Sequence, residues 1–482
     1  EFSCNAASNN GGALRLETTD ATLTSCSLFD NHAGQSGGAL RAVNSNLVTM
    51  LNSTLSQNTA QTQGGAIEVN GNSSSTLQVL NCSLVENIAS IDGTGAINAT
   101  GAGQLVEIRY SAFQDNGPGA SLKADFGATL TSLGHNLGDF TIPGAVGTDL
   151  SNTDARLAPL GAYGGFSLSH LPLANSPVID ATTQQIPPYG LAGDQRGLPR
   201  IANGDNTGLT FLDIGAVEAG RFLTVNTATD ENDGTAAGTG FALREAIALA
   251  SPGQHVRFNG IVQGATLDLS LGTIQMAAGK HVHIDASSLI FRPTITGSTS
   301  LFDVGGNLDE VVTFHGINFD DVSTNSTIDL SDPSSGLQAT FTSCTFTNLE
   351  SSNPGGAIRI GGAGSSALPA MLVLDRCHFE ENSSDGAGEA VSAVNSTLRL
   401  RRSCFLRNAG PQSAVHCIDS HLIIDRCTIS ENEGQATEYF LGENRAFKVV
   451  NSTVSGNTGS TNNNPFETYG STYASTIAHC TI

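Results

Sequence analysis

Charged side chains that could do chemistry gather in the C-terminal third of the chain. Arginines and carboxylates alternate there at short intervals; they are Arg399, Arg401, Arg402, Arg407 and Arg426 with Asp375, Glu380, Asp385, Asp425 and Glu431. A polysaccharide lyase combines carboxylates that hold Ca²⁺ with a Lys or Arg base, and a glycoside hydrolase needs paired carboxylates. The alternative is a solvated polar face. We favour that alternative and predict no enzyme, because a chain with no Trp and 6 Tyr offers few platforms for sugar stacking.

A second group of oxygen ligands lies near the middle of the chain, in the run Asp230-Glu231-Asn232-Asp233-Gly234. Carboxylates at close spacing before a glycine turn suit a weak Ca²⁺ site, with Asp230 and Asp233 as the ligands. The run lacks a terminal bidentate Glu, so a polar turn is the competing interpretation. A similar but weaker suggestion comes from Asp194, Asp205 and Asp213. We predict no other cofactor.

The balance of charges narrows the range of partners. The chain of 482 residues carries 21 Lys and Arg against 44 Asp and Glu, a formal net charge of −23. Such a chain is a poor ligand for nucleic acids and anionic membrane surfaces, and no apolar run approaches the ~18 residues that a membrane helix needs. We therefore predict no nucleic-acid partner and no membrane insertion.

One recurring motif indicates which secondary-structure elements position the candidate arginines and carboxylates. It consists of Cys or Ser, a short apolar strand and a closing Asn. The closing asparagines are Asn31, Asn58, Asn87 and Asn116 in a first block, and Asn348, Asn382, Asn408, Asn432 and Asn457 in a second. They are 27, 29 and 29 residues apart in the first block and 34, 26, 24 and 25 apart in the second. A Gly-Gly-Ala-(Leu/Ile) motif runs in phase with them, starting at Gly11, Gly37, Gly64 and Gly355.

A repeat period in this range predicts a solenoid. Apolar residues fill runs of strand length such as 77–80 and 398–400, and helical periodicity is lacking, so the coils consist of β-strands. We predict an all-β fold: a right-handed parallel β-helix in two blocks, with coils about 4.8 Å apart. All the closing asparagines except Asn348 are expected to form a structural ladder, each amide pairing with the next. The Gly-Gly pairs supply turn dihedrals that a Cβ would forbid.

Two further features of the motif have more than one interpretation. Glycosylation sequences occur at Asn52, Asn81, Asn395 and Asn451, but they fall out of the repeat itself, so structural stacking is the better account. Cysteines at the motif's first position predict a buried stack of thiols, namely Cys26, Cys82, Cys344, Cys377, Cys404 and Cys427. Neighbouring coils are close enough for a disulfide, although a small apolar filler is the simpler interpretation. The total of nine cysteines is odd, so at least one cannot pair within the chain.

Two segments between the blocks carry motifs of another kind. In order along the chain they are Leu157-Ala158-Pro159-Leu160-Gly161, Asp194-Gln195-Arg196-Gly197, Asp213-Ile214-Gly215-Ala216-Val217-Glu218, Leu223-Thr224-Val225-Asn226 and Leu243-Arg244-Glu245-Ala246. With the repeats, they make the chain resemble large bacterial surface proteins that combine polymorphic outer-membrane-type β-helix repeats with a choice-of-anchor Q domain and a CSLREA domain. Phe241-Ala242 stands where the CSLREA family has Cys-Ser. The resemblance implies secretion, a place outside the cell or on its surface and a β-helix, but no reaction.

The repeats and the resemblance together predict four parts. Residues 1–131 are a first β-helix block, 132–220 a choice-of-anchor Q-like segment, 221–300 a CSLREA-like capping segment, and 301–482 a second β-helix block. Within the third part Leu243, Ile247 and Ala250 have helical spacing, so we expect a short helix over 241–250. Laid across the first coil of the second block, that helix would cover strand edges and apolar interior that otherwise invite aggregation.

The order of these parts predicts self-assembly. Phe2-Ser3-Cys4-Asn5 matches the end of the repeat motif and Cys480-Thr481-Ile482 its beginning, so both termini are expected inside a coil. Bare coils would stack head-to-tail, with an interface between copies made by Phe2, Cys4, Asn5, Cys480 and Ile482. We therefore predict a secreted structural subunit of an extracellular filament or stalk. The alternatives are an adhesin that binds a glycan or a host protein and, less favoured, a polysaccharide lyase or hydrolase.

Overall fold

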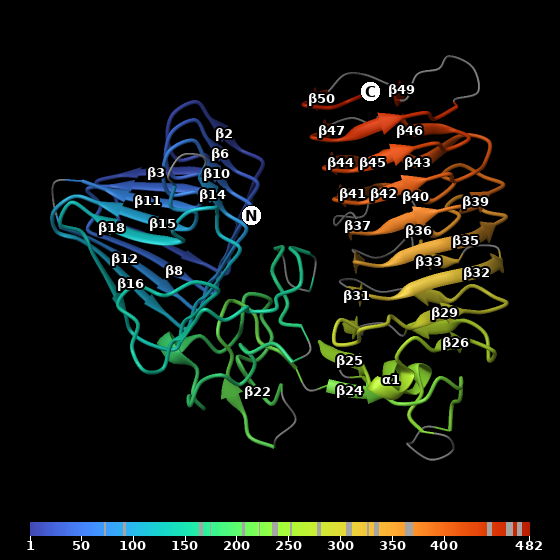
Figure 1. Cartoon of the computed structure of the whole chain (residues 1–482), viewed down its shortest axis with the longest axis horizontal. Helices are drawn as coiled ribbons and strands as arrows, with labels where there is room; N and C mark the ends of the chain where they lie inside the picture. Colours follow the sequence, from blue (N-terminus) through green and yellow to red (C-terminus); the bar gives the residue numbers. More distant parts are fainter. Residues whose placement is uncertain are drawn as a thin grey trace. The chain divides into compact units, whose positions relative to one another are not determined.

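The computed structural model of the chain divides into two compact units, unit 1 (residues 1–221) and unit 2 (residues 222–482). Each unit is described by itself (Figure 1). The structure describes all residues except 72–73, 90–92, 162, 164–166, 174, 205–207, 221, 234–239, 251–252, 277–280, 305–310, 325–326, 332–336, 362–369, 441–445, 459–465 and 470–474.

Unit 1 winds its strands into four parallel sheets. Sheet A contains β1 (Phe2–Ser3), β5 (Ser27–Phe29), β9 (Thr54–Ser56), β13 (Ser83–Val85), β17 (Ala112–Gln114), β20 (Leu137–Gly138) and β21 (Leu150–Ser151). Sheet B contains β2 (Ala6–Ala7), β6 (His32–Ala33), β10 (Thr59–Ala60) and β14 (Ile88–Ala89). Sheet C contains β3 (Leu14–Glu17), β7 (Leu40–Val43), β11 (Ile67–Asn70), β15 (Ile97–Thr100) and β18 (Leu122–Asp125). Sheet D contains β4 (Ala21–Thr24), β8 (Leu47–Leu51), β12 (Ser75–Leu80), β16 (Gln104–Arg109) and β19 (Thr129–Ser132).

Unit 2 winds into three parallel sheets. Sheet E contains β24 (Phe222–Val225), β25 (Gln254–Phe258), β28 (Val282–Asp285), β31 (Val311–His315), β34 (Gln338–Thr342), β37 (Ala370–Asp375), β41 (Ser396–Arg401), β44 (His421–Asp425), β47 (Phe447–Val450) and β50 (Ser475–Ala478). Sheet F contains β26 (Thr266–Asp268), β29 (Thr294–Thr296), β32 (Asn318–Thr324), β35 (Thr345–Ser351), β38 (His378–Glu380), β42 (Cys404–Leu406), β45 (Thr428–Ser430) and β48 (Thr453–Ser455), and β39 (Ser383–Ser384) pairs with β35. Sheet G contains β27 (Ile274–Met276), β30 (Phe302–Val304), β33 (Ile328–Leu330), β36 (Ile358–Gly361), β40 (Val391–Val394), β43 (Ser413–Ile418), β46 (Gln435–Phe440) and β49 (Phe466–Tyr469).

Each coil turns at corners where one residue has a left-handed backbone conformation. At the corner that leads into sheets A and F this residue is, for example, Asn52 (φ 45°) or Arg376 (φ 53°). The residue after it is usually Ser or Cys, whose side chain donates to the carbonyl two residues earlier, as Ser53 Oγ does to Leu51 O at 2.7 Å. Such a local bond supports a tight turn. At the Gly-Gly corner Gly37 has φ 69°, and a Cβ on Gly38 would lie 2.0 Å from Gly65 O of the next coil.

The interior is filled by files of apolar side chains, each file containing one residue per coil. In sheet A the file runs through Leu28, Leu55, Leu84 and Phe113. In sheet F it runs through Phe319, Phe346, Phe379 and Phe405, whose successive ring centroids are 4.9, 4.4 and 4.6 Å apart with the rings nearly parallel. The strands of successive coils are of similar length and pair in parallel without a shift in register. Each apolar side chain therefore lies directly over the equivalent apolar side chain of the next coil.

One end of each column and one face of unit 1 are covered by other segments. In unit 2, α1 (Leu243–Leu249) packs Leu243, Ala246 and Ile247 against the interior beside β24 and β25, at one end of the column in Figure 1. In unit 1, Phe140 and Ile142 close the interior after β19. A mostly irregular segment, residues 155–219, covers the outer face of sheet A.

That segment contains an antiparallel pair, β22 (Ile201–Ala202) and β23 (Phe211–Leu212), and a short 3-10 helix, η1 (Pro188–Gly190). Unit 2 has a second 3-10 helix, η2 (Gly260–Val262).

The predicted parallel β-solenoid in two blocks with a short capping helix is confirmed. The helix spans Leu243–Leu249, inside the predicted range 241–250. The change of unit at residues 221 and 222 lies beside the predicted division at 220 and 221. The division predicted at 300 and 301 falls between β29 and β30, where the sheets of unit 2 continue without a break. Residues 222–300 therefore contribute strands to the column as well as its cap.

Candidate functional site

The closing asparagines of unit 1 form a continuous hydrogen-bonded file. Asn31 donates from its backbone N and from Nδ2 to Oδ1 of Asn58, at 3.1 and 2.9 Å. Asn58 makes the same pair of bonds to Asn87, and Asn87 to Asn116. Asn58 Nδ2 also donates to Leu28 O of the preceding coil at 2.9 Å. Leaving a buried polar group without its partner costs about 1–3 kcal/mol, so each coil is held by the amide of the next.

Unit 2 repeats the file over four successive coils. Asn382, Asn408, Asn432 and Asn457 are linked by Nδ2–Oδ1 bonds of 2.9, 2.9 and 2.7 Å. Asn348 is not part of this file, so its interpretation as a closing residue is wrong by one position. Leu349 takes the closing place and donates its backbone N to Asn382 Oδ1 at 3.2 Å. Asn348 is instead the left-handed residue before the corner (φ 53°).

Cysteine and serine alternate in a second file, at the corner that leads into sheets A and F. In unit 1 it runs Cys26, Ser53, Cys82, Ser111, and in unit 2 Cys344, Cys377, Ser403, Cys427, Ser452, Cys480. The predicted stack of thiols is thus a mixed file, and Cys404 lies outside it, because strand pairing aligns Ser403 with Cys377 and turns Cys404 to the outer face. Burial raises the pKa of the Cys82 and Cys427 thiols to about 12, which makes them unreactive.

The predicted arginines and carboxylates of unit 2 tie neighbouring coils together. Asp375 is almost fully buried and receives Arg402 Nε and Nη2, both at 2.8 Å. Asp425 receives Arg426 Nε at 3.0 Å and Asn451 Nδ2 at 3.0 Å, and Arg401 Nη2 lies 4.0 Å away. Arg401 and Arg402 therefore reach in opposite directions along the column, one to the next coil and one to the preceding coil.

A second group of charges lies on the outer face of sheet F. Arg407 pairs with Glu380, with Glu381 at 3.4 Å and with Glu431 at 3.7 Å, so it links three successive coils. The Arg407 side chain is 44% exposed, and such a pair contributes little to stability in water. Asp385 is exposed in the turn that follows and makes none of these ion pairs. The structure thus brings together two groups of charges, each organised as ties between coils.

The two predicted calcium ligands, Asp230 and Asp233, form hydrogen bonds with different partners. Asp230 receives Arg244 Nε and Nη2, both at 2.8 Å, and the backbone N of Leu271. Asp233 donates its backbone N to Glu245, which also accepts the N–H of Ala242 at the start of α1. Sequence reasoning missed this Arg244–Asp230 tie. Gly234 and Asp205 lie outside the described residues, and calcium binding at Asp230 and Asp233 stays a prediction.

Buried carboxylates hold the irregular segment of unit 1 in shape. Asp194 accepts Arg196 Nε and Nη2 at 3.0 and 2.8 Å and the backbone N of Glu218 at 2.9 Å, with both members of the ion pair buried. Asp213 accepts two backbone N–H groups at 2.6 Å. Burial raises the pKa of Asp213 to about 7 and that of Glu218 well above its usual range. Residues 155–219 have few hydrogen bonds of the β-sheet kind, and these carboxylates accept backbone N–H groups instead. Their role is therefore structural.

The residues predicted to mediate assembly lie at the outermost coils. Phe2 belongs to the edge strand β1 and is half-buried, while Asn5 is exposed and donates to Asn31 Oδ1. Cys4 is the left-handed residue before Asn5. At the other edge, Cys480 is half-buried and Ile482 is 62% exposed. Ile477 of the edge strand β50 continues an interior file and is 48% exposed.

Comparison with known families identifies the fold of unit 2 and leaves its activity open. Residues 304–482 match the family model of the right handed beta helix region, in agreement with the predicted hand of the coil. No curated protein matches the chain. Among the described residues, none of the helices is long and apolar enough to cross a membrane. The same part of the chain contains no group of three or more His, Cys, Asp or Glu side chains that could hold a metal ion. A β-helix of this kind is consistent with a surface or structural protein.

Proposed function

We propose that the chain is a structural column of an extracellular or cell-surface protein, which adds further coils at its edges to form a stalk or filament. The observation that carries the proposal is that the side chains able to do chemistry serve as ties between coils or as supports of the turns. The asparagine amides bond to one another, Arg401, Arg402, Arg407 and Arg426 lie against carboxylates, and the buried thiols cap turns.

The resemblance of the middle of the chain supports the same role. We infer that residues 132–220 are a choice-of-anchor Q-like part and 221–300 a CSLREA-like part. Asp194, Arg196, Asp213 and Glu218 belong to the Q-like motifs, and Arg244 and Glu245 to the CSLREA-like motif. These side chains bond to backbone N–H groups and cap a helix, so we assign the motifs a structural role. Secretion follows from the resemblance, and limited proteolysis of intact producing cells would test it: the chain should be cleaved from outside.

The edge coils support growth by coil addition. The asparagine file has a direction, because each amide donates to the Oδ1 of the following coil. At one edge, Asn5 Oδ1 is an acceptor for an amide of an added coil. At the other edge, Asn457 carries N–H groups that can donate to the Oδ1 of an added coil. The next coil comes either from a longer chain or from a second copy, and the same complementarity serves both.

Electron microscopy of the chain at micromolar concentration, with sedimentation velocity, tests end-to-end growth. We expect thin fibres and a concentration-dependent increase in mass. Leu16→Lys places a charge in the interior file of edge strand β3 and should abolish fibres, as should Ile477→Lys on β50. Arg15→Lys and Thr476→Lys are matched controls, since both residues face outward on the same strands. A monodisperse 49.5 kDa particle would contradict self-assembly.

A further inference from the structure

One pair of cysteines stands out in the mixed Cys/Ser file. Cys344 and Cys377 occupy the same position in two successive coils, with no serine between them. Every other described thiol of the file has serine as its described neighbour: Ser53 lies next to Cys26, and Ser403 and Ser452 lie on either side of Cys427. Two adjacent thiols therefore occur at a single place in the described part of the file.

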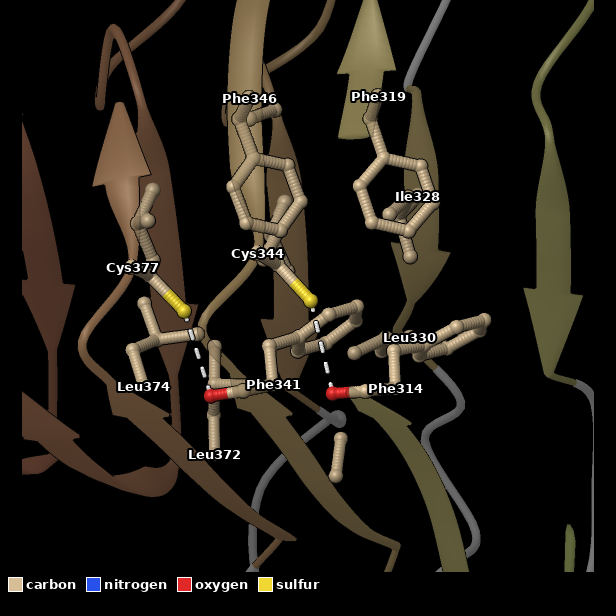
Figure 2. Close-up of a cluster of buried hydrophobic side chains, with 14 of the residues drawn as sticks. Phe314, Phe319, Ile328, Leu330, Phe341, Cys344, Phe346, Leu372, Leu374 and Cys377 are labelled. Carbon is tan, nitrogen blue, oxygen red and sulfur yellow. Dashed lines mark hydrogen bonds between the residues drawn. The ribbon is translucent and has the colours of Figure 1, made fainter. Parts of the chain in front are cut away.

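The geometry around this pair repeats from coil to coil. The backbone N of His378 donates to Cys344 O at 3.0 Å, which sets the two cysteines in parallel register. Cys344 Sγ lies 3.5 Å from Phe314 O and Cys377 Sγ lies 3.3 Å from Phe341 O, and these phenylalanines are themselves paired. Figure 2 shows both sulfurs pointing the same way from neighbouring strands. Strands in register are about 4.8 Å apart, within the Cα separation of about 4.4–6.8 Å that a disulfide spans.

We propose that Cys344 and Cys377 form a disulfide that links two successive coils of unit 2 when the chain folds in contact with a disulfide oxidant. One thiolate attacks the oxidant, RS–SR, giving a mixed disulfide and releasing RS⁻. The second cysteine gives up its proton and attacks the sulfur of the first, and the second RS⁻ leaves. Two protein thiols are thereby oxidised and one RS–SR is reduced to two RSH. The parallel register already holds the two backbones at a separation that a disulfide spans.

The two thiols are electrostatically unequal in the folded column. Burial acts to raise the pKa of Cys344, but its hydrogen bond with Cys377 and nearby backbone groups outweigh burial and lower that pKa overall. The pKa of Cys377 is raised well above its usual range, by burial and by the same hydrogen bond. These shifts belong to the folded column, so either cysteine can attack the oxidant first while the coils are still winding.

Burial determines when the bond forms. Cys344 is 1% and Cys377 2% exposed, so an oxidant cannot reach them in the finished column. The bond therefore forms while the coils are winding, and it does not form in protein that folded reduced. This timing separates the pair from Cys404, which is only half-buried on the outer face of sheet F.

The test is refolding of the full chain with oxidised and reduced glutathione, followed by alkylation in denaturant without reduction. We expect seven of the nine thiols to be alkylated. Trypsin cuts after Arg359 and Arg376, between the two cysteines, so their peptides should remain joined until reduction. Cys344→Ser, a substitution the file accepts at Ser403 and Ser452, should yield eight alkylated thiols and no joined peptide. Cys427→Ser is the matched control and should yield six, with the joined peptide retained.

Two results would overturn the proposal: free thiols on both cysteines in oxidatively refolded protein, or a joined peptide that persists in Cys344→Ser. Where refolding from denaturant gives no native protein, the same peptides are analysed from chain exported to an oxidising bacterial periplasm. A joined or a free pair there decides the question in the same way.

Discussion

Sheet A of unit 1 and sheet F of unit 2 occupy the same place in their coils but use their outer faces differently. The outer face of sheet A carries small side chains such as Thr54, Ser56 and Ser83, all buried beneath residues 155–219. The outer face of sheet F carries Glu380 and the ion pairs of Arg407, and it is partly exposed. The inner faces hardly differ: both present one apolar residue per coil. The coil thus determines the interior, and the choice of outer residues decides whether a face is covered.

The largest expected effect concerns the covered face. Asp194→Ala removes the partner of buried Arg196 and the acceptor of several backbone N–H groups. We expect the opening free energy of residues 155–219 to fall by about 3–5 kcal/mol, as for other broken buried ion pairs. Hydrogen exchange measured peptide by peptide would follow it, with sheets E to G of unit 2 as the internal control. Unchanged protection of residues 155–219 would refute a structural role for this pair.

A change of pH should alter the stabilities of the two units in opposite directions. In unit 1, burial raises the pKa of Glu68 to about 7 despite hydrogen bonds from Asn98 and Thr100. Its contribution to stability is present below the ordinary carboxyl pKa of about 4.5 and is lost as pH rises through 7. In unit 2, burial lowers the pKa of His416 to about 4, so its contribution is present above pH 6.5 and is lost as pH falls through 4.

Between pH 4.5 and 6.5 we therefore expect raising the pH to weaken unit 1 and strengthen unit 2, by roughly 2–3 kcal/mol each across this interval. Hydrogen exchange at several pH values, corrected for the intrinsic exchange rate, measures both at once. Glu68→Gln should reduce the slope in the coils around Glu68 and leave the profile of unit 2 unchanged. Asp213 and Glu218, whose pKa values are also raised, should keep the slope in residues 155–219. Parallel profiles in the wild type would contradict the assignment.

A smaller effect is expected from exchanging the fillers of the two inner faces. Phe379→Leu puts into sheet F the residue that sheet A has at Leu28, Leu55 and Leu84. The stacked ring is lost but the volume is nearly kept, so we expect a cost of about 1–2 kcal/mol in local opening energy. A loss near the 3–5 kcal/mol typical of truncating Phe to Ala would mean that the phenylalanine stack, and not volume alone, specifies unit 2.

The smallest effect should come from the exposed charges. Arg407→Ala breaks three ion pairs that lie in water, and we expect a change below about 1 kcal/mol, reduced further by salt. Comparison of the same variant at low and high salt isolates the electrostatic part. A loss as large as that of Asp194→Ala would show that exposed and covered faces are held equally by charge, and the distinction drawn between the two sheets would fail.

The sequence predicted the coil well because its interior repeats residue types at fixed intervals. Its errors share a physical origin. Asn is favoured both in the left-handed corner position and in the ladder, so Asn348 fits either of two neighbouring places. Ser and Cys both cap the preceding turn, so Ser403-Cys404 is ambiguous until strand pairing is known. In each case the sequence motif fits equally well when it is shifted by one residue, but the shift changes which side chain lies at the corner of the coil.

Contacts between residues distant in the chain could not be predicted in this way. A carboxylate attracts a guanidinium as readily as a cation, and only the fold brings Arg244 to Asp230. The covering of sheet A likewise depends on pairs such as Thr54 and Gln195, which are 141 residues apart and belong to no repeat. The motifs quoted from the middle segments contain Asp194, Arg196 and Asp213, but nothing in those motifs reveals that these side chains bond to backbone groups.

The orientation of the strands has a mechanical consequence. They lie across the column, so the hydrogen bonds between coils run along its axis, and tension applied to the ends loads the last coil before any other. A coil, which in most places has 24 to 29 residues, then peels away as a whole. Its release lengthens the chain by roughly 80–100 Å, where the folded coil occupied about 4.8 Å. Under a steady pull such a column would yield in discrete steps and rewind on the exposed coil when the force drops, damping sudden loads while remaining resistant to bending.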